Sequence, residues 1–173
     1  FIGTAGNDTT AIRYLIDTIN GSPVALTNGI IGGWAIVNND HFATYDSVRG
    51  VSYLSNTADG FANYSSTNLS TAGTTDNVND GTSRTLSAST SVNSIRFSGG
   101  ATHTLNAGTL LTVNTGGILG QTNAGHGFTG AGQITSGSGE LNVFVNQNTM
   151  TIGAQITGDI ALTKAGGATL TLS

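Results

Sequence analysis

Three residues close together in the sequence, His41, Asp46 and Ser47, are of the types that hydrolases use as base, orienting acid and nucleophile. The chain has no Gly-x-Ser-x-Gly elbow, which would hold such a serine at a sharp strand-to-helix turn. Polar residues beside a turn are the simpler interpretation of all three. We therefore predict no catalytic residues here.

A second set consists of Glu140 and Asp159, 19 residues apart, with Lys164 nearby. In a coiled stack of strands this spacing can place two carboxylates about one coil apart, which suits an enzyme that cleaves polysaccharides. However, the nine acidic residues are scattered and only five residues are Lys or Arg. We expect solvated turn positions and no enzyme, with a polysaccharide-active β-helix as the competing hypothesis.

Metal binding is the third chemistry to consider. Four aspartates carry the oxygen ligands that Ca²⁺ prefers: Asp8, Asp40, Asp76 and Asp80. Neither an EF-hand loop nor the Gly-Gly-x-Gly-x-Asp repeat of calcium-binding β-rolls accompanies them. His103 and His126 are isolated and lack metal-ligand spacing. We predict no metal and no cofactor.

The composition restricts the class of protein. Gly, Thr, Ser and Asn make up 87 of the 173 residues, only 8% of residues are charged, and there is no Cys. The five cations are spread singly and the net charge is −4, which excludes a nucleic-acid-binding face. No apolar run is long enough for a membrane-spanning helix. We expect an extracellular or cell-surface bacterial protein, and an excerpt of a longer polypeptide.

The elements that must position these residues are short strands. Apolar–small–apolar triplets begin at Leu141, Met150, Ile160 and Leu170, with Gly, Asn and Thr between them, which indicates an all-β fold. Such spacing is typical of a sandwich, a barrel or a coiled stack of strands. Strong strands also recur at intervals of 16 to 23 residues, which favours the coils of a β-solenoid: Ile95, Leu111, Ile134, Met150 and Leu170.

The first part of the chain, residues 1–83, differs from the regular coils expected over residues 84–173. Residues 12–19 fit a helix or a strand, and a strand is favoured because the surroundings are all-β. A hairpin follows, with Trp34 and Phe42 as packing anchors. A carbohydrate-binding β-sandwich built around these two aromatic residues and Tyr45 is the competing architecture. Residues 55–83 are polar and predict a long loop, for which Leu69 and Val78 are the expected apolar anchors.

Residues 162–173 carry the most specific motif of the chain. Its defining positions are Leu162, Thr163, Lys164, Gly166, Gly167, Thr169, Leu170 and Leu172. The stretch resembles the autotransporter-associated β-strand repeat, Leu-Thr-Lys-x-Gly-x-Gly-Thr-Leu-x-Leu-Ser-Gly, although Gly167-Ala168 displaces the second glycine. A looser similarity extends over residues 24–173. The resemblance implies a right-handed parallel β-helix in a large secreted or surface-displayed bacterial protein, and it carries over no catalytic residue.

From these observations we expect a stalk, fibre or adhesin segment that self-assembles into filaments. Its expected partners are like copies or neighbouring repeats, together with surface glycans. Asparagines at turn positions can form ladders along stacked coils, and mutual satisfaction inside the stack is favoured over a binding face. The candidates are Asn28, Asn114, Asn142, Asn146 and Asn148.

Overall fold

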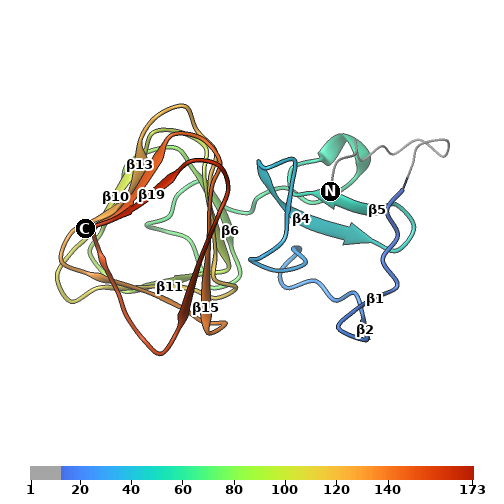
Figure 1. The fold of residues 1–173 in the computed structure, drawn as a ribbon, viewed down its shortest axis with the longest axis horizontal. Coiled ribbons are helices and arrows are strands. Elements are labelled where there is room, and N and C mark those ends of the chain that lie inside the picture. The colour runs from blue at the N-terminus through green and yellow to red at the C-terminus, as the bar shows by residue number, and fades with distance from the viewer. Residues whose placement is uncertain (1–12) are drawn as a thin grey trace.

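The computed structural model describes residues 13–173, and its dominant feature is a parallel β-solenoid (Figure 1). The first two coils contain β6 (Asn77–Asp80), β7 (Thr85–Leu86), β8 (Thr90–Val92), β9 (Ser94–Phe97), β10 (Thr102–Leu105) and β11 (Leu110–Val113). The next two contain β12 (Gly117–Gly120), β13 (His126–Thr129), β14 (Gln133–Ser136), β15 (Glu140–Val145), β16 (Thr149–Ile152) and β17 (Gln155–Ile156). A further coil begins with β18 (Ala161–Ala165) and β19 (Thr169–Leu172).

Each coil adds one strand to each of three sheets, in the orders β18-β15-β12-β9-β6, β19-β16-β13-β10-β7 and β17-β14-β11-β8. All neighbours in these sheets are parallel. The solenoid prediction is therefore confirmed. The sandwich alternative is wrong, because the strands of residues 77–172 pair in parallel with strands of the neighbouring coils, whereas a sandwich is built from antiparallel sheets.

The register corrects the predicted coil boundaries. Ile95 pairs with Ile118, and Ile118 pairs with Val143, so these coils hold 23 and 25 residues. Ile95 and Leu111, which were expected in successive coils, lie in β9 and β11 of the same coil. The triplets at 9- to 10-residue intervals lie on two sides of two successive coils: those at Leu141 and Met150 fall in β15 and β16, and those at Ile160 and Leu170 fall at β18 and β19.

Inward-facing residues of the strands form one continuous core, because side chains alternate between the two faces of a strand. Leu, Ile, Val and Phe fill this core, and most of them are fully buried. Each such side chain contributes roughly 1.5–3 kcal/mol relative to an exposed one. A single coil cannot bury these residues alone, so the stack is the unit of stability.

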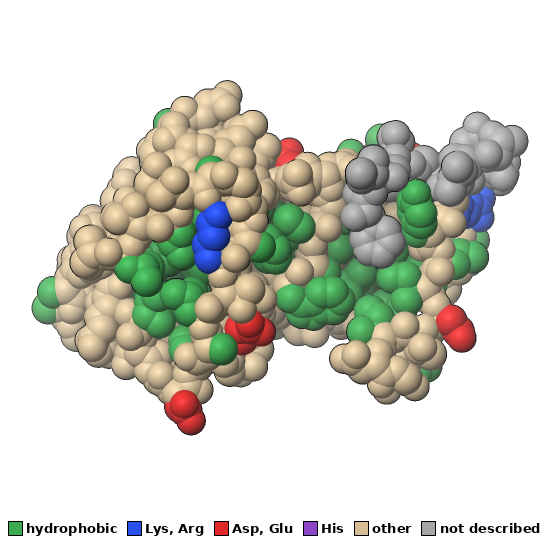
Figure 2. Space-filling view, in the orientation of Figure 1, with side chains coloured by type: hydrophobic (Ala, Val, Ile, Leu, Met, Phe, Trp, Pro, Cys, Tyr) green, Lys and Arg blue, Asp and Glu red, His purple; other side chains and the backbone are tan. Residues whose placement is uncertain are grey.

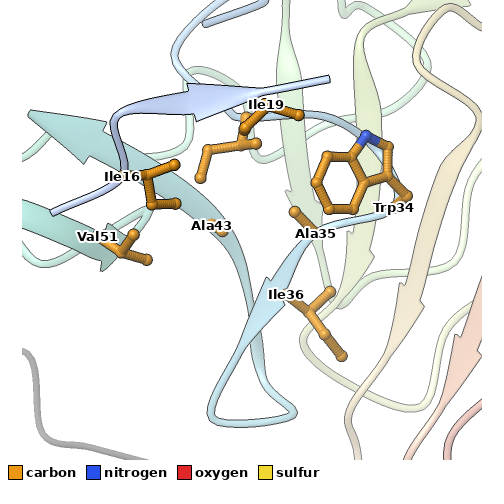
Figure 3. A pocket seen from close by; sticks show the side chains of 8 residues that line it. Ile16, Ile19, Trp34, Ala35, Ile36, Ala43 and Val51 are labelled. Atoms are coloured by element: carbon orange, nitrogen blue, oxygen red, sulfur yellow. The ribbon is translucent and has the colours of Figure 1, made fainter. Parts of the chain in front are cut away.

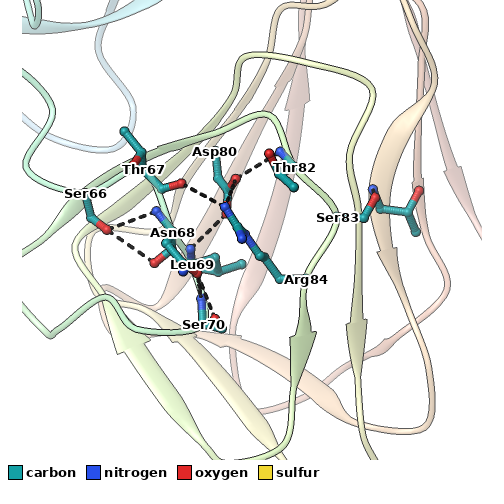
Figure 4. Close-up of polar contacts among 10 residues, drawn as sticks. Ser66, Thr67, Asn68, Leu69, Ser70, Asp80, Thr82, Ser83 and Arg84 are labelled. Atoms are coloured by element: carbon teal, nitrogen blue, oxygen red, sulfur yellow. Dashed lines mark hydrogen bonds and ion pairs between the residues drawn. The ribbon is translucent and has the colours of Figure 1, made fainter.

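The two ends of the solenoid differ. At the β6 end, Leu69 is fully buried against the core, and its N–H donates to the Asp80 carboxylate at 2.9 Å (Figure 4). Arg84 also binds Asp80, through Nε at 3.1 Å. At the other end, Leu162 and Leu172 are 38% and 54% exposed. Figure 2 looks onto this end and shows hydrophobic side chains gathered over it.

Residues 55–83 are mostly irregular, as expected. They contain the 3-10 helix η1 (Thr57–Asp59) and end in β6, the first strand of the solenoid. Both predicted anchors, Leu69 and Val78, are fully buried.

A smaller antiparallel lobe flanks the solenoid (Figure 1). Its strands are β1 (Thr18–Ile19), β2 (Ser22–Pro23), β3 (Ile36–Val37), β4 (His41–Asp46) and β5 (Gly50–Tyr53). The predicted hairpin is confirmed as β3 and β4. The strand expected over residues 12–19 is wrong for most of its described length, since only β1 forms there. Tertiary packing against Tyr45 and Val51 replaces local pairing in this stretch.

The lobe packs on the outer face of the β18-β15-β12-β9-β6 sheet. Phe42, Leu54 and Tyr64 form a buried cluster with Leu119 and Phe144, which point outward from the solenoid. Phe42 is fully buried and is a packing anchor, as predicted. Trp34 was also predicted to be a packing anchor, but this prediction is wrong, because Trp34 is 55% exposed.

Candidate ligand-binding groove

A polar groove lies where the lobe meets the solenoid. It is a cavity of about 380 Å³, a size typical of sites for small ligands. The lobe contributes Thr27, Ile31, Gly32, Gly33 and Trp34, and the solenoid contributes Asn114, Thr115, Gly137, Ser138, Glu140 and Asn142. These residues are far apart in the sequence, and only the docking of the lobe brings them together.

Glycines position Trp34 in this groove. The chain at Gly33 approaches the solenoid corner at Gly117 so closely that a Cβ on Gly33 would lie 2.4 Å from the Gly117 nitrogen. Only a residue without a side chain fits on either side of this contact. Trp34 follows directly, so its indole is held beside the sheet while half of its surface stays exposed.

Asn142 lines the groove and is 8% exposed. No hydrogen bond of its side-chain amide is found among residues 13–173, so the two donor hydrogens and the acceptor oxygen are free to bind a ligand. The other amide in the groove, Asn114, donates to Thr74 O and accepts from Ser91 Oγ.

Glu140 is the one charged residue that lines the groove. One of its carboxylate oxygens, Oε1, accepts a hydrogen bond from the Thr163 hydroxyl of the next coil. Its backbone oxygen accepts from Ser136 Oγ at 2.7 Å, which fixes the start of β15. The groove therefore joins an aromatic face to amide, hydroxyl and carboxylate groups.

The lobe side of Trp34 borders an apolar pocket, also of about 380 Å³ (Figure 3). Its other walls are the aliphatic side chains Ile16, Ile19, Ile31, Ala35, Ile36, Ala43 and Val51. Trp34 and Ile31 thus line both the apolar pocket and the polar groove.

A charged network fastens the lobe to the solenoid. Arg96, on β9, donates through Nε to the backbone oxygen of Asp40 at 2.6 Å and through Nη2 to its carboxylate. His41 Nε2 lies 3.3 Å from the same carboxylate, and its Nδ1 lies 3.3 Å from the Tyr64 hydroxyl. Partial burial works against ionisation of Asp40, but hydrogen bonds from His41 and Arg96 and the Arg96 charge outweigh it and lower its pKa to about 2. Burial raises the pKa of Tyr64.

The three residues considered for a hydrolase triad, His41, Asp46 and Ser47, do not form one in the structure. His41 and Asp46 lie at opposite ends of β4, and Asp46 instead accepts hydrogen bonds from the N–H groups of Val48 and Arg49. The second set, Glu140, Asp159 and Lys164, does not form a catalytic group either. Lys164 donates to Gly166 O at 2.6 Å, while Asp159 is exposed.

The three candidate calcium aspartates that lie within residues 13–173 have protein partners. Asp40 binds Arg96, Asp76 accepts the N–H of Gly73, and Asp80 binds Leu69 and Arg84. Asp8 lies outside the described residues. Within residues 13–173 no three His, Cys, Asp or Glu side chains are grouped closely enough to hold a metal ion.

Both solenoid histidines point into the core. His103 is fully buried between Phe97 and Phe128, with ring centroids 5.2 and 5.8 Å away, and neither of its nitrogens has a hydrogen-bond partner. Burial lowers the pKa of His103 to about 4. Burial also lowers the pKa of His126, although its hydrogen bond to Ala124 O opposes the shift.

The predicted asparagine ladders do not form among the five candidates. Asn28 donates to Asn93, which in turn donates to Asn77, at the junction of the lobe and the solenoid. Asn146 and Asn148 donate to backbone oxygens of Asn39 and Asn123. Side-chain amide pairs do link adjacent coils elsewhere, between Asn93 and Asn77 and between Gln133 and Gln155.

One sheet of the solenoid presents threonines on its outward face in every coil, mostly at positions that the sequence analysis did not single out. Alternation along the sheet β19-β16-β13-β10-β7 points one set of residues outward. They are Thr85, Thr102, Thr104, Gly127, Thr129, Thr149, Thr151, Thr169 and Thr171. The sequence does contain Thr-x-Thr segments. Such a segment places both threonines on the outward face only if it forms a strand whose other face is buried.

The repeat-like motif forms β18, the turn at Gly166 and β19. Gly166 has a φ of +89°, which suits a glycine at this turn. Leu162 and Leu170 stack on buried Leu141 and Met150, and Lys164 occupies the column of Val143. No helix in the described part of the chain has the length and apolar character needed to cross a membrane. Comparison with protein-family models, curated proteins and solved structures gave no match.

Proposed function

We propose that this chain is a non-catalytic structural and adhesive segment of a large extracellular bacterial surface protein, of the kind that carries autotransporter-associated β-strand repeats. The observation that carries the proposal is the outward face of β7, β10, β13, β16 and β19, which presents threonines on every coil and no charged side chain. A stiff stack with a neutral hydroxyl surface can form many weak contacts along its length, and many such contacts act together.

The adhesive role is tested with beads that carry the folded chain, washed under flow over immobilised bacterial cells and cell-wall glycan. We expect retention that is lost when the same beads are treated with denaturant and not refolded. Equal retention of the folded and unfolded chain would contradict the proposal.

Association with like copies or neighbouring repeats is supported by the exposed end at β18 and β19. Leu162 and Leu172 there occupy columns that are buried in the preceding coil. A neighbouring repeat or a like copy that stacks on this end buries both leucines. Sedimentation equilibrium over a range of concentrations measures the expected association, and a monomer at every concentration would contradict it.

A further inference from the structure

We infer that the groove between Trp34 and Asn142 binds a neutral saccharide. This inference rests on the adhesive role proposed above and assigns that role a site and a class of ligand. The groove has one flat aromatic wall, and its other lining residues carry amide, hydroxyl and carboxylate groups.

The aromatic wall is the first argument. Trp34 is the single tryptophan of the chain and keeps 55% of its surface exposed, although the lobe has an apolar pocket beside it. A pyranose ring has one face of C–H bonds that packs on an indole, and hydroxyls at its rim that need hydrogen-bond partners. A purely apolar ligand would leave the polar side of the groove unmatched.

The unpartnered amide is the second argument. Asn142 is nine-tenths buried, lines the groove and makes no described hydrogen bond with its side chain. A pair of adjacent sugar hydroxyls can accept from its NH₂ and donate to its oxygen.

Charge decides between neutral and acidic saccharides. The charged side chain in the groove is Glu140, which is an acceptor for hydroxyl groups and repels carboxylates and sulfates. The chain as a whole carries a net charge of −4. Uronates and sialylated chains are therefore expected to bind more weakly than neutral ones.

The test is a titration of the whole chain that follows the fluorescence of Trp34, with maltotriose, cellotriose and tri-N-acetylchitotriose as neutral probes and trigalacturonate as the acidic probe. We expect saturable changes with at least one neutral probe at millimolar concentrations. Asn142→Ala is expected to weaken that binding about tenfold, the equivalent of one or two lost hydrogen bonds. The matched control is Asn123→Ala, which removes an exposed amide that does not line the groove.

Trp34→Ala removes the fluorophore, so its binding is followed by saturation-transfer NMR with the same probe, and a complete loss is expected. Circular dichroism verifies that each variant is folded. The inference is overturned if no neutral probe binds, if trigalacturonate binds as tightly, or if Asn142→Ala and Asn123→Ala bind alike. Bead retention without saccharide binding would contradict this site and leave the adhesive role standing. Saccharide binding without bead retention would contradict the adhesive role and leave the site standing.

Discussion

Gly33 and Gly117 pack backbone against backbone, 84 positions apart in the sequence, and this contact sets the lobe on the solenoid. A Cβ on Gly117 would lie 2.6 Å from the Gly33 Cα and 2.7 Å from Phe42 Cε1. Both distances are shorter than atoms tolerate, so the lobe would have to move. The groove beside Trp34 depends on this contact because Trp34 follows Gly33 directly.

Gly117→Ala is therefore expected to destabilise the chain by about 1–3 kcal/mol, as overpacking does. Urea unfolding measures the loss, and a shift of Trp34 fluorescence reports the displaced loop. The control is Gly167→Ala, whose added Cβ meets nothing within 4 Å. An unchanged unfolding midpoint for Gly117→Ala would show that the close contact is absent in solution.

Because the two ends of the solenoid differ in burial, a leucine-to-alanine substitution is expected to lower the free energy of unfolding by different amounts at the two ends. Leu69→Ala empties a fully buried position and is expected to cost about 2–5 kcal/mol. Leu172→Ala, at a side chain that is 54% exposed, is expected to cost less than about 1 kcal/mol. Denaturant unfolding of both variants gives the comparison. Equal costs would mean that Leu69 does not close the first coil.

The buried histidines predict a loss of stability in mild acid. His103 has a pKa of about 4 in the folded chain, against 6.5 when it is exposed. Burial is the main cause, the Asp80 charge opposes the shift, and the Arg84 charge adds to it. Between these two values the unfolded chain binds a proton that the folded chain does not, so stability falls as the pH falls. The loss through His103 approaches about 3 kcal/mol near pH 4.

Urea unfolding at about pH 7.5 and about pH 4.5 measures this effect. His103→Leu is expected to reduce this dependence, and His126, whose pKa is shifted in the same direction, contributes to the part that persists. Asp40 does not interfere, because its lowered pKa affects stability only as the pH falls from 3.8 toward 2. A wild type and a His103→Leu variant with the same pH dependence would contradict the prediction.

Much of the solenoid could be predicted because its signal is local. Ile95, Leu111 and Leu141, which the sequence analysis places on strands, lie in β9, β11 and β15. Their apolar residues alternate with polar ones, and this pattern needs no knowledge of neighbours. In contrast, β13 was missed because His126 and Gly127 weaken the alternation, although His126 faces the core.

Short strands with one apolar face, turns rich in Gly and Asn, and the stacking of these strands all follow from local sequence patterns. The grouping of strands into coils, the closure of one end by Leu69, and the position of Trp34 beside Asn142 and Glu140 depend on tertiary contacts. The physical reason is the distance along the sequence over which each kind of interaction acts. Alternation and turn chemistry act between residues a few positions apart, whereas the groove results from a contact between Gly33 and Gly117 that no local pattern encodes.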